Sequence, residues 1–136
     1  MSAAPTPPPS VRGGPRSPFA RAGSVARWSA RILGVLLAIL FLIFALGGGE
    51  RGGRGPDVGE WAMMTALLVA FAGFAIGWRS DALGGTAILA GFVIFEAINL
   101  SRAGQFALGP VFPLFGVAGL LHLVAALARR IERASP

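Results

Sequence analysis

Two polar side chains, Glu96 and Asn99, lie near one end of an apolar stretch that runs from residue 82 to residue 100. This stretch has about the length of an α-helix that crosses the hydrocarbon core of a bilayer. A carboxylate in hydrocarbon is costly, so Glu96 should face protein or water, or be protonated. At about 1.5 Å per residue it lies only about 7 Å from the helix end, within reach of interfacial water. Glu96 is therefore either a structural carboxylate bonded to a neighbouring helix or a site for a proton, cation or substrate.

His122 is the single histidine of the chain and lies in another apolar stretch, residues 111–128. By helical rise it lies roughly 14–21 Å from the outer surface, much deeper than Glu96, so we do not expect the two side chains to pair. We interpret it as a hydrogen-bonded packing residue, with a proton-relay member or a haem ligand as alternatives. At helical spacing its face also carries Phe115, Ala118, Gly119 and Arg129.

Other patterns that carry chemistry are missing from the sequence. The chain has no cysteine, which excludes disulfides, thiol catalysis and thiolate metal sites. It contains no phosphate-binding loop, Ser/His/Asp set, zinc-binding helix motif or pair of catalytic carboxylates. The sequence therefore predicts a protein that is not an enzyme and that holds no cofactor or metal.

Four apolar blocks must position these side chains. Hydrophobic residues make up 54% of the chain and charged residues 13%, whereas a soluble domain has about 25% charged residues. The apolar residues cluster in blocks, without the regular polar face of a soluble helix. We therefore predict an all-α membrane protein, an antiparallel four-helix transmembrane bundle with a disordered N-terminal tail. The expected helices cover residues 28–46, 61–78, 82–100 and 111–128.

The domain organisation follows the composition. Residues 1–26 are basic and rich in proline, have little apolar surface to bury, and are predicted to be disordered. Residues 27–130 form the expected transmembrane domain, and residues 131–136 a short cytoplasmic tail. The alternative to a retained first helix is a signal peptide cleaved after Gly47, although the stretch before its apolar core is long for one.

The loop before the second block carries acidic residues in a pattern typical of a helix start. Asp57, followed three residues later by Glu60, predicts a capping box for the next helix. A cation site formed by Glu50, Asp57 and Glu60 is the alternative. Arg102, in the second short outer loop, is the expected counter-ion of Glu96 or Glu60.

Small residues recur along the second block at three- and four-residue spacing and include the pattern Gly73-x-x-x-Gly77. Helices in a membrane gain little by burying apolar side chains, so they associate by close approach through small residues. Gly73 and Gly77 are therefore candidate helix-packing residues, either within the chain or in a dimer seam.

The basic residues are all arginine, and the formal net charge is +6. Four spans place nine arginines on the side of both chain ends and three on the other side. Because positive residues stay on the cytoplasmic side, we expect both termini in the cytoplasm. This orientation explains the basic charge, so nucleic acid is not an expected partner. The expected partners are the lipid bilayer and either a second copy of the chain or another membrane protein.

Several short segments carry a family resemblance. They are Ala30-Arg31-Ile32-Leu33-Gly34, Phe44-Ala45-Leu46-Gly47, Gly77-Trp78-Arg79, Leu83-Gly84-Gly85, Asn99, Phe112-Pro113-Leu114 and Gly119-Leu120-Leu121. In these segments the chain resembles the small bacterial four-helix integral membrane proteins grouped as a domain of unknown function. The resemblance covers about residues 27–130 and leaves out the tail. It implies the four-helix fold and carries over no functional residue.

On these grounds we expect a non-enzymatic integral membrane protein of structural or partner-binding type in a bacterial inner or plasma membrane. The alternative is a small oligomeric transporter or channel that uses Glu96 as its intramembrane coupling residue. Small multidrug exporters of comparable size resemble this chain less well, because they carry their essential glutamate in the first helix and this chain has none there.

Overall fold

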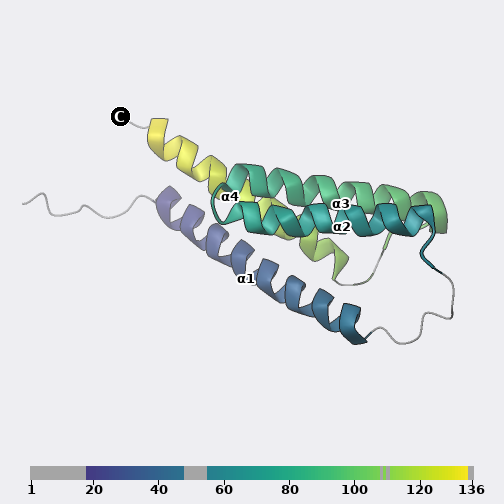
Figure 1. Ribbon diagram of the computed structural model, residues 1–136. Coiled ribbons are helices and arrows are strands. Elements are labelled where there is room, and N and C mark those ends of the chain that lie inside the picture. Colours follow the sequence, from purple (N-terminus) through teal and green to yellow (C-terminus); the bar gives the residue numbers. More distant parts are fainter. Residues whose placement is uncertain (1–17, 48–54, 108, 110, 135–136) are drawn as a thin grey trace, which may run out of the picture.

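The computed structural model describes residues 18–47, 55–107, 109 and 111–134 (Figure 1). These residues form four α-helices, and the described part of the chain contains no strand. Each helix is long and apolar enough to cross a membrane. The predicted all-α fold with four membrane-spanning helices is confirmed. In chain order the helices are α1 (Pro18–Gly47), α2 (Val58–Gly77), α3 (Asp81–Ala103) and α4 (Phe112–Ala134).

α1 begins earlier than predicted. Residues 18–26, expected to belong to the disordered tail, form its first turns. Proline is well tolerated at a helix start, and the early turns are held by packing against the end of α4. Ala26 is buried, and a Cβ placed on Gly23 would lie 2.8 Å from that of Ala128. Residues 1–17, the rest of the predicted tail, lie outside the described residues.

Two other helices also run past their predicted ends. α3 continues to Ala103, so the start of the expected outer loop is helical, and Gly104 ends the helix in the left-handed conformation (φ 67°). α4 begins at Phe112, one residue after the expected start at residue 111, and continues to Ala134 through much of the expected C-terminal tail. The membrane-spanning pattern thus marks the apolar centre of each helix, while polar turns extend it at the ends.

The helices pack as a chain of neighbours, as Figure 1 shows. α2 and α3 form a tight hairpin, α3 packs on α4, and α4 packs on α1. α1 touches α2 only lightly. The turn between α2 and α3 therefore lies at the same end of the bundle as the C-terminal half of α4 and the N-terminal half of α1, as the ion pairs of Asp81 require.

The apolar core is a small cluster to which all four helices contribute. The rings of Phe71 and Phe115 meet edge to face with their centres 5.4 Å apart, and Phe41 packs at a tilt against Phe71 with the ring centres 4.9 Å apart. Such contacts add about 0.5–1.5 kcal/mol each beyond area burial. The buried members of the cluster are Leu37, Ala70, Phe74, Ile88, Phe115 and Ala118.

Most of the apolar surface faces outward. Only 22% to 33% of the residues in each membrane-spanning window are buried inside the protein. Leu68, Leu83 and Val93, for example, expose more than 60% of their surface. In water so large an apolar surface would drive aggregation, whereas lipid tails solvate it.

Candidate functional site

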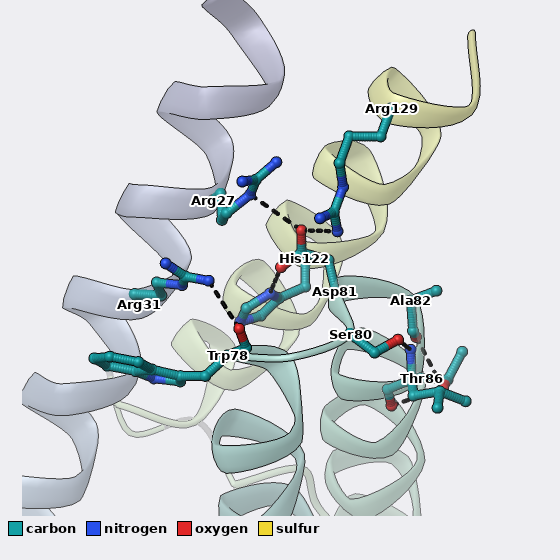
Figure 2. A network of polar contacts seen from close by, with 10 residues as sticks. Arg27, Arg31, Trp78, Ser80, Asp81, Ala82, Thr86, His122 and Arg129 are labelled. Atoms are coloured by element: carbon teal, nitrogen blue, oxygen red, sulfur yellow. Dashed lines mark hydrogen bonds and ion pairs between the residues drawn. The ribbon is translucent and has the colours of Figure 1, made fainter. Parts of the chain in front are cut away.

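A buried carboxylate, that of Asp81, is the centre of a polar cluster at one end of the bundle (Figure 2). Asp81 is the first residue of α3 and only 1% exposed. The turn before it is short, and the side chain of Ser80 caps the helix by accepting a hydrogen bond from the Leu83 N–H. This geometry directs the Asp81 side chain inward between α1 and α4. We call Asp81, Arg27, His122 and Arg129 the Asp81 cluster.

Three basic side chains surround the Asp81 carboxylate. Oδ1 lies 3.2 Å from Nδ1 of His122, which is itself 1% exposed. Oδ2 lies 3.2 Å from Nε of Arg27 and also accepts a hydrogen bond from Nη2 of Arg129. A buried carboxylate is stable only when it is paired and hydrogen-bonded. The cluster therefore ties the start of α3 to α1 and, at two points, to α4.

Arg31, one turn after Arg27, makes a second link from α1 to the helical hairpin. Its Nη2 donates a hydrogen bond of 3.1 Å to the backbone oxygen of Trp78, at the end of α2. Its guanidinium also lies 5.7 Å from the ring centre of Trp28 and 5.2 Å from that of Trp78. A guanidinium over aromatic faces is stabilised by the ring quadrupole. Arg31 thus satisfies a helix-end carbonyl and contacts one tryptophan on α1 and one at the end of α2.

The chemistry of the Asp81 cluster suits a structural role, in which its side chains hold three helices together. A carboxylate that holds a histidine ring is found both in catalytic sites and in metal sites. Here the cluster contains no hydroxyl or thiol nucleophile. Within the described residues no three His, Cys, Asp or Glu side chains are placed to hold a metal ion together. The cluster can neutralise charge and align helices.

Glu96 lies about 22 Å from Asp81 along α3, at the other end of the bundle. It is 8% exposed, and its Oε2 accepts a hydrogen bond of 3.0 Å from the backbone N–H of Ala107. Asn99 donates from Nδ2 to the backbone oxygen of Gln105, 2.9 Å away. Both side chains therefore fold the segment after α3 back onto the helix. His122 belongs to the Asp81 cluster, so the structure does not bring it together with Glu96 and Asn99.

Arg102, the predicted counter-ion of Glu96 or Glu60, pairs with a different carboxylate. Arg102 donates to Oδ2 of Asp57, with 2.6 Å between the two atoms, instead of pairing with either glutamate. The capping box explains the choice. Asp57 Oδ1 accepts from the Glu60 N–H, and Oε2 of Glu60 accepts from the Asp57 N–H, which leaves Oδ2 of Asp57 for Arg102.

The capping box itself is confirmed. The hydrogen bond from Arg102, together with the one from the Glu60 N–H, lowers the pKa of Asp57 below its ordinary value. Glu50, which the alternative cation site needs as its third member, lies outside the described residues.

A cavity of about 640 Å³ opens beside Glu96 between α3 and α4. Apart from Glu96 its lining is apolar, and it includes Phe92 and Val93 of α3 and Val117 and Leu120 of α4. Its chemistry suits an apolar side chain or an acyl chain.

Gly73 and Gly77 lie where α2 approaches other helices most closely. A Cβ on Gly73 would lie 2.7 Å from the backbone nitrogen of Ile88 in α3. A Cβ on Gly77 would lie 2.7 Å from Cε1 of His122 in α4. The two glycines therefore pack within the chain, and Gly77 leaves the room that the His122 ring occupies.

One family match spans residues 20–134, which covers the Asp81 cluster and all but the first two residues of the four helices. The chain belongs to the family described as domain of unknown function DUF7670. This confirms the resemblance to a four-helix family of that kind. No curated protein and no solved structure matches the chain.

Sequence reasoning misses Asp81, the central residue of the Asp81 cluster. His122 and Arg129 lie 41 and 48 residues away from it in the chain, and Asp81 itself falls between the expected helices 61–78 and 82–100. One signal was available. Among the arginines predicted on the cytoplasmic side there are only two acidic residues, Asp81 and Glu132, and Asp81 precedes an apolar helix. A single acid at that position, opposite a helix face that carries His122 and Arg129, predicts an ion pair.

Proposed function

We propose that this DUF7670 chain is a non-enzymatic integral membrane protein with a structural or partner-binding role. The observation that carries the proposal is that the polar side chains of the Asp81 cluster and of the end of α3 are bonded within the fold. Asp81 is paired with arginine and histidine, Glu96 accepts the Ala107 N–H, and Asn99 donates to Gln105. Polar groups used in this way stabilise a scaffold, and the scaffold then acts through its surface.

The apolar cavity beside Glu96 supports binding of a partner helix. Val93, Val117 and Leu120 line it and are 61%, 46% and 56% exposed. Gly116, on the same wall, leaves a gap in the surface of α4. Helices associate in lipid by van der Waals contact at such sites, so a helix of another membrane protein or of a second copy fits there.

Site-specific photo-crosslinking in native membranes tests this role. A photoreactive phenylalanine analogue at Val93 or Val117 is expected to give a reproducible protein adduct. Leu68 is the control, because it is 62% exposed on α2 and does not line the cavity. Adducts with lipid alone at all three positions would contradict the proposal, and adducts between copies of the chain would identify the partner as a second copy.

A transport or channel function is the second candidate, and one observation favours it. Glu96 is a carboxylate within a membrane-spanning helix and it lines the 640 Å³ cavity. If Glu96 couples transport, Glu96→Gln should abolish proton-linked flux in reconstituted vesicles while helicity is unchanged. Asn99→Ala is a suitable control for loss of the neighbouring structural bond. Unchanged flux in Glu96→Gln, or no flux in the wild type, would eliminate this candidate.

A further inference from the structure

A second basic site lies at the same end of the bundle as the Asp81 cluster but on its outer surface. It is a cavity of about 220 Å³ where the turn between α2 and α3 meets the last turns of α4. Four arginines line it, and among the described lining residues there is no carboxylate. We call it the arginine pocket; its arginines are Arg79, Arg129, Arg130 and Arg133.

The charges of these arginines are only partly neutralised within the fold. Arg129 is paired with Asp81, which is buried and already shared with Arg27 and His122. Arg79, Arg130 and Arg133 are exposed. Like charges held at one site repel one another, so the pocket favours an anion.

The start of α3 adds to the positive electrostatic potential of the arginine pocket. Ser80 and Ala82 line the pocket, so the N-terminal end of a 23-residue helix, with its partial positive charge, borders the cavity. The negative charge of Asp81 at the same helix start is compensated inside the bundle by its three basic neighbours. The Ser80 hydroxyl and the guanidinium groups provide donors suited to phosphate oxygens.

We propose that the arginine pocket binds the phosphate of an anionic phospholipid headgroup. The ligand chemistry is a phosphate ester, and its position indicates a lipid as the source. The pocket lies at the ends of membrane-spanning helices, where headgroups are found. Leu83 and Leu127, the sequence neighbours of lining residues Ala82 and Ala126, are 64% and 58% exposed and offer an apolar surface to acyl chains.

Native mass spectrometry of the full chain, released from a neutral detergent, tests the proposal. The protein is titrated with phosphatidylglycerol, with phosphatidylcholine of the same acyl chains, and with inorganic phosphate. We expect one phosphatidylglycerol to bind about tenfold more tightly than phosphatidylcholine, because arginines near a surface contribute about 1 kcal/mol each toward an anionic lipid. Excess inorganic phosphate should not displace it.

Single charge removals then locate the site. Arg79→Gln and Arg133→Gln should each weaken phosphatidylglycerol binding about fivefold. Arg21→Gln is the matched control, because Arg21 is an exposed arginine near the start of α1 and does not line the pocket. It should change binding less than twofold. Far-ultraviolet circular dichroism checks that each variant keeps its helices.

The outcomes separate cleanly. Equal binding of the two lipids overturns the proposal on the wild type alone, whether or not any variant folds. Equal losses in Arg21→Gln and Arg79→Gln mean a diffuse charge effect and also overturn it. Displacement of the lipid by inorganic phosphate would assign the pocket to a soluble anion and overturn the lipid assignment.

Discussion

Asp81 illustrates how one residue organises the end of a helix bundle. Its carboxylate is buried, yet it replaces the lost hydration with His122 and the guanidinium groups of Arg27 and Arg129. The arginines are 29% and 35% exposed, so their charges remain partly solvated. Contacts with α1 and α4 thus offset the cost of burying the carboxylate, and they hold the start of α3 against these two helices.

Asp81→Asn should lower the free energy of unfolding by about 2 kcal/mol, because it leaves two arginines facing a neutral amide. The figure is below that for a fully buried pair because both arginines reach solvent. Titration with denaturing detergent in mixed micelles measures it.

Asp57→Asn is the matched control for this substitution. It removes the same charge from the exposed pair with Arg102, while asparagine still caps a helix as aspartate does. Asp57→Asn should therefore lower the free energy of unfolding clearly less than Asp81→Asn does. An equal loss for the two variants would contradict the view that the buried Asp81 carboxylate is the stronger tie.

Glu96 and Arg102 show that residue types alone predict which side chains need a partner but not which partner they find. Because a carboxylate in lipid is costly, the sequence correctly predicts that Glu96 has a hydrogen-bond partner. It does not predict that this partner is the Ala107 N–H. Charge alone proposes Arg102 as that partner. The capping geometry of Asp57, which depends on the backbone of α2, directs Arg102 elsewhere.

At the scale of the elements, glycine decides how closely α2 and α3 approach. Gly73 faces the backbone of Ile88, and Gly91 faces the backbone around Ala66 and Ala70. Backbone atoms cannot move aside as a flexible side chain can, so the hairpin depends on the missing Cβ atoms. The spacing of small residues predicts such a contact, but it leaves open whether the partner is within the chain.

Gly73→Ala should lower the free energy of unfolding by about 1–3 kcal/mol, because its Cβ would overlap the backbone of α3. Gly116→Ala is the control, since its Cβ would meet only Phe92, at an ordinary 3.4 Å. It should leave stability unchanged or raise it by up to about 1 kcal/mol through helix propensity. The same unfolding titration measures both, and a neutral Gly73→Ala would show that the helices are less closely packed there.

For the whole molecule, the helix order leaves α1 attached mainly to α4. At one end the Asp81 cluster links α1 to α3 and α4, and Arg31 links α1 to the end of α2. The Phe41–Phe71 contact supplies a second link from α1 to α2 further along. The outward faces stay apolar, as is expected of helices that are surrounded by lipid tails.

The arginine distribution leads to a topological prediction for the whole chain. Reporter fusions after Pro136 and before Met1 should both report the cytoplasm, and an insertion at Gly55 should report the opposite side. Nine arginines on one side against three on the other are the physical reason. Ends found on opposite sides of the membrane would contradict the proposed orientation.

The sequence by itself determined four membrane-spanning helices, because block hydrophobicity needs no knowledge of neighbours, and it determined the Asp57–Glu60 cap, because that motif is local. Tertiary structure decided the pairing of Asp81 with Arg27, His122 and Arg129, the destination of Arg102, and the gathering of the arginine pocket. Each of these joins residues more than 40 positions apart in the chain. Such contacts depend on which helices become neighbours and at what register, and no local pattern specifies that.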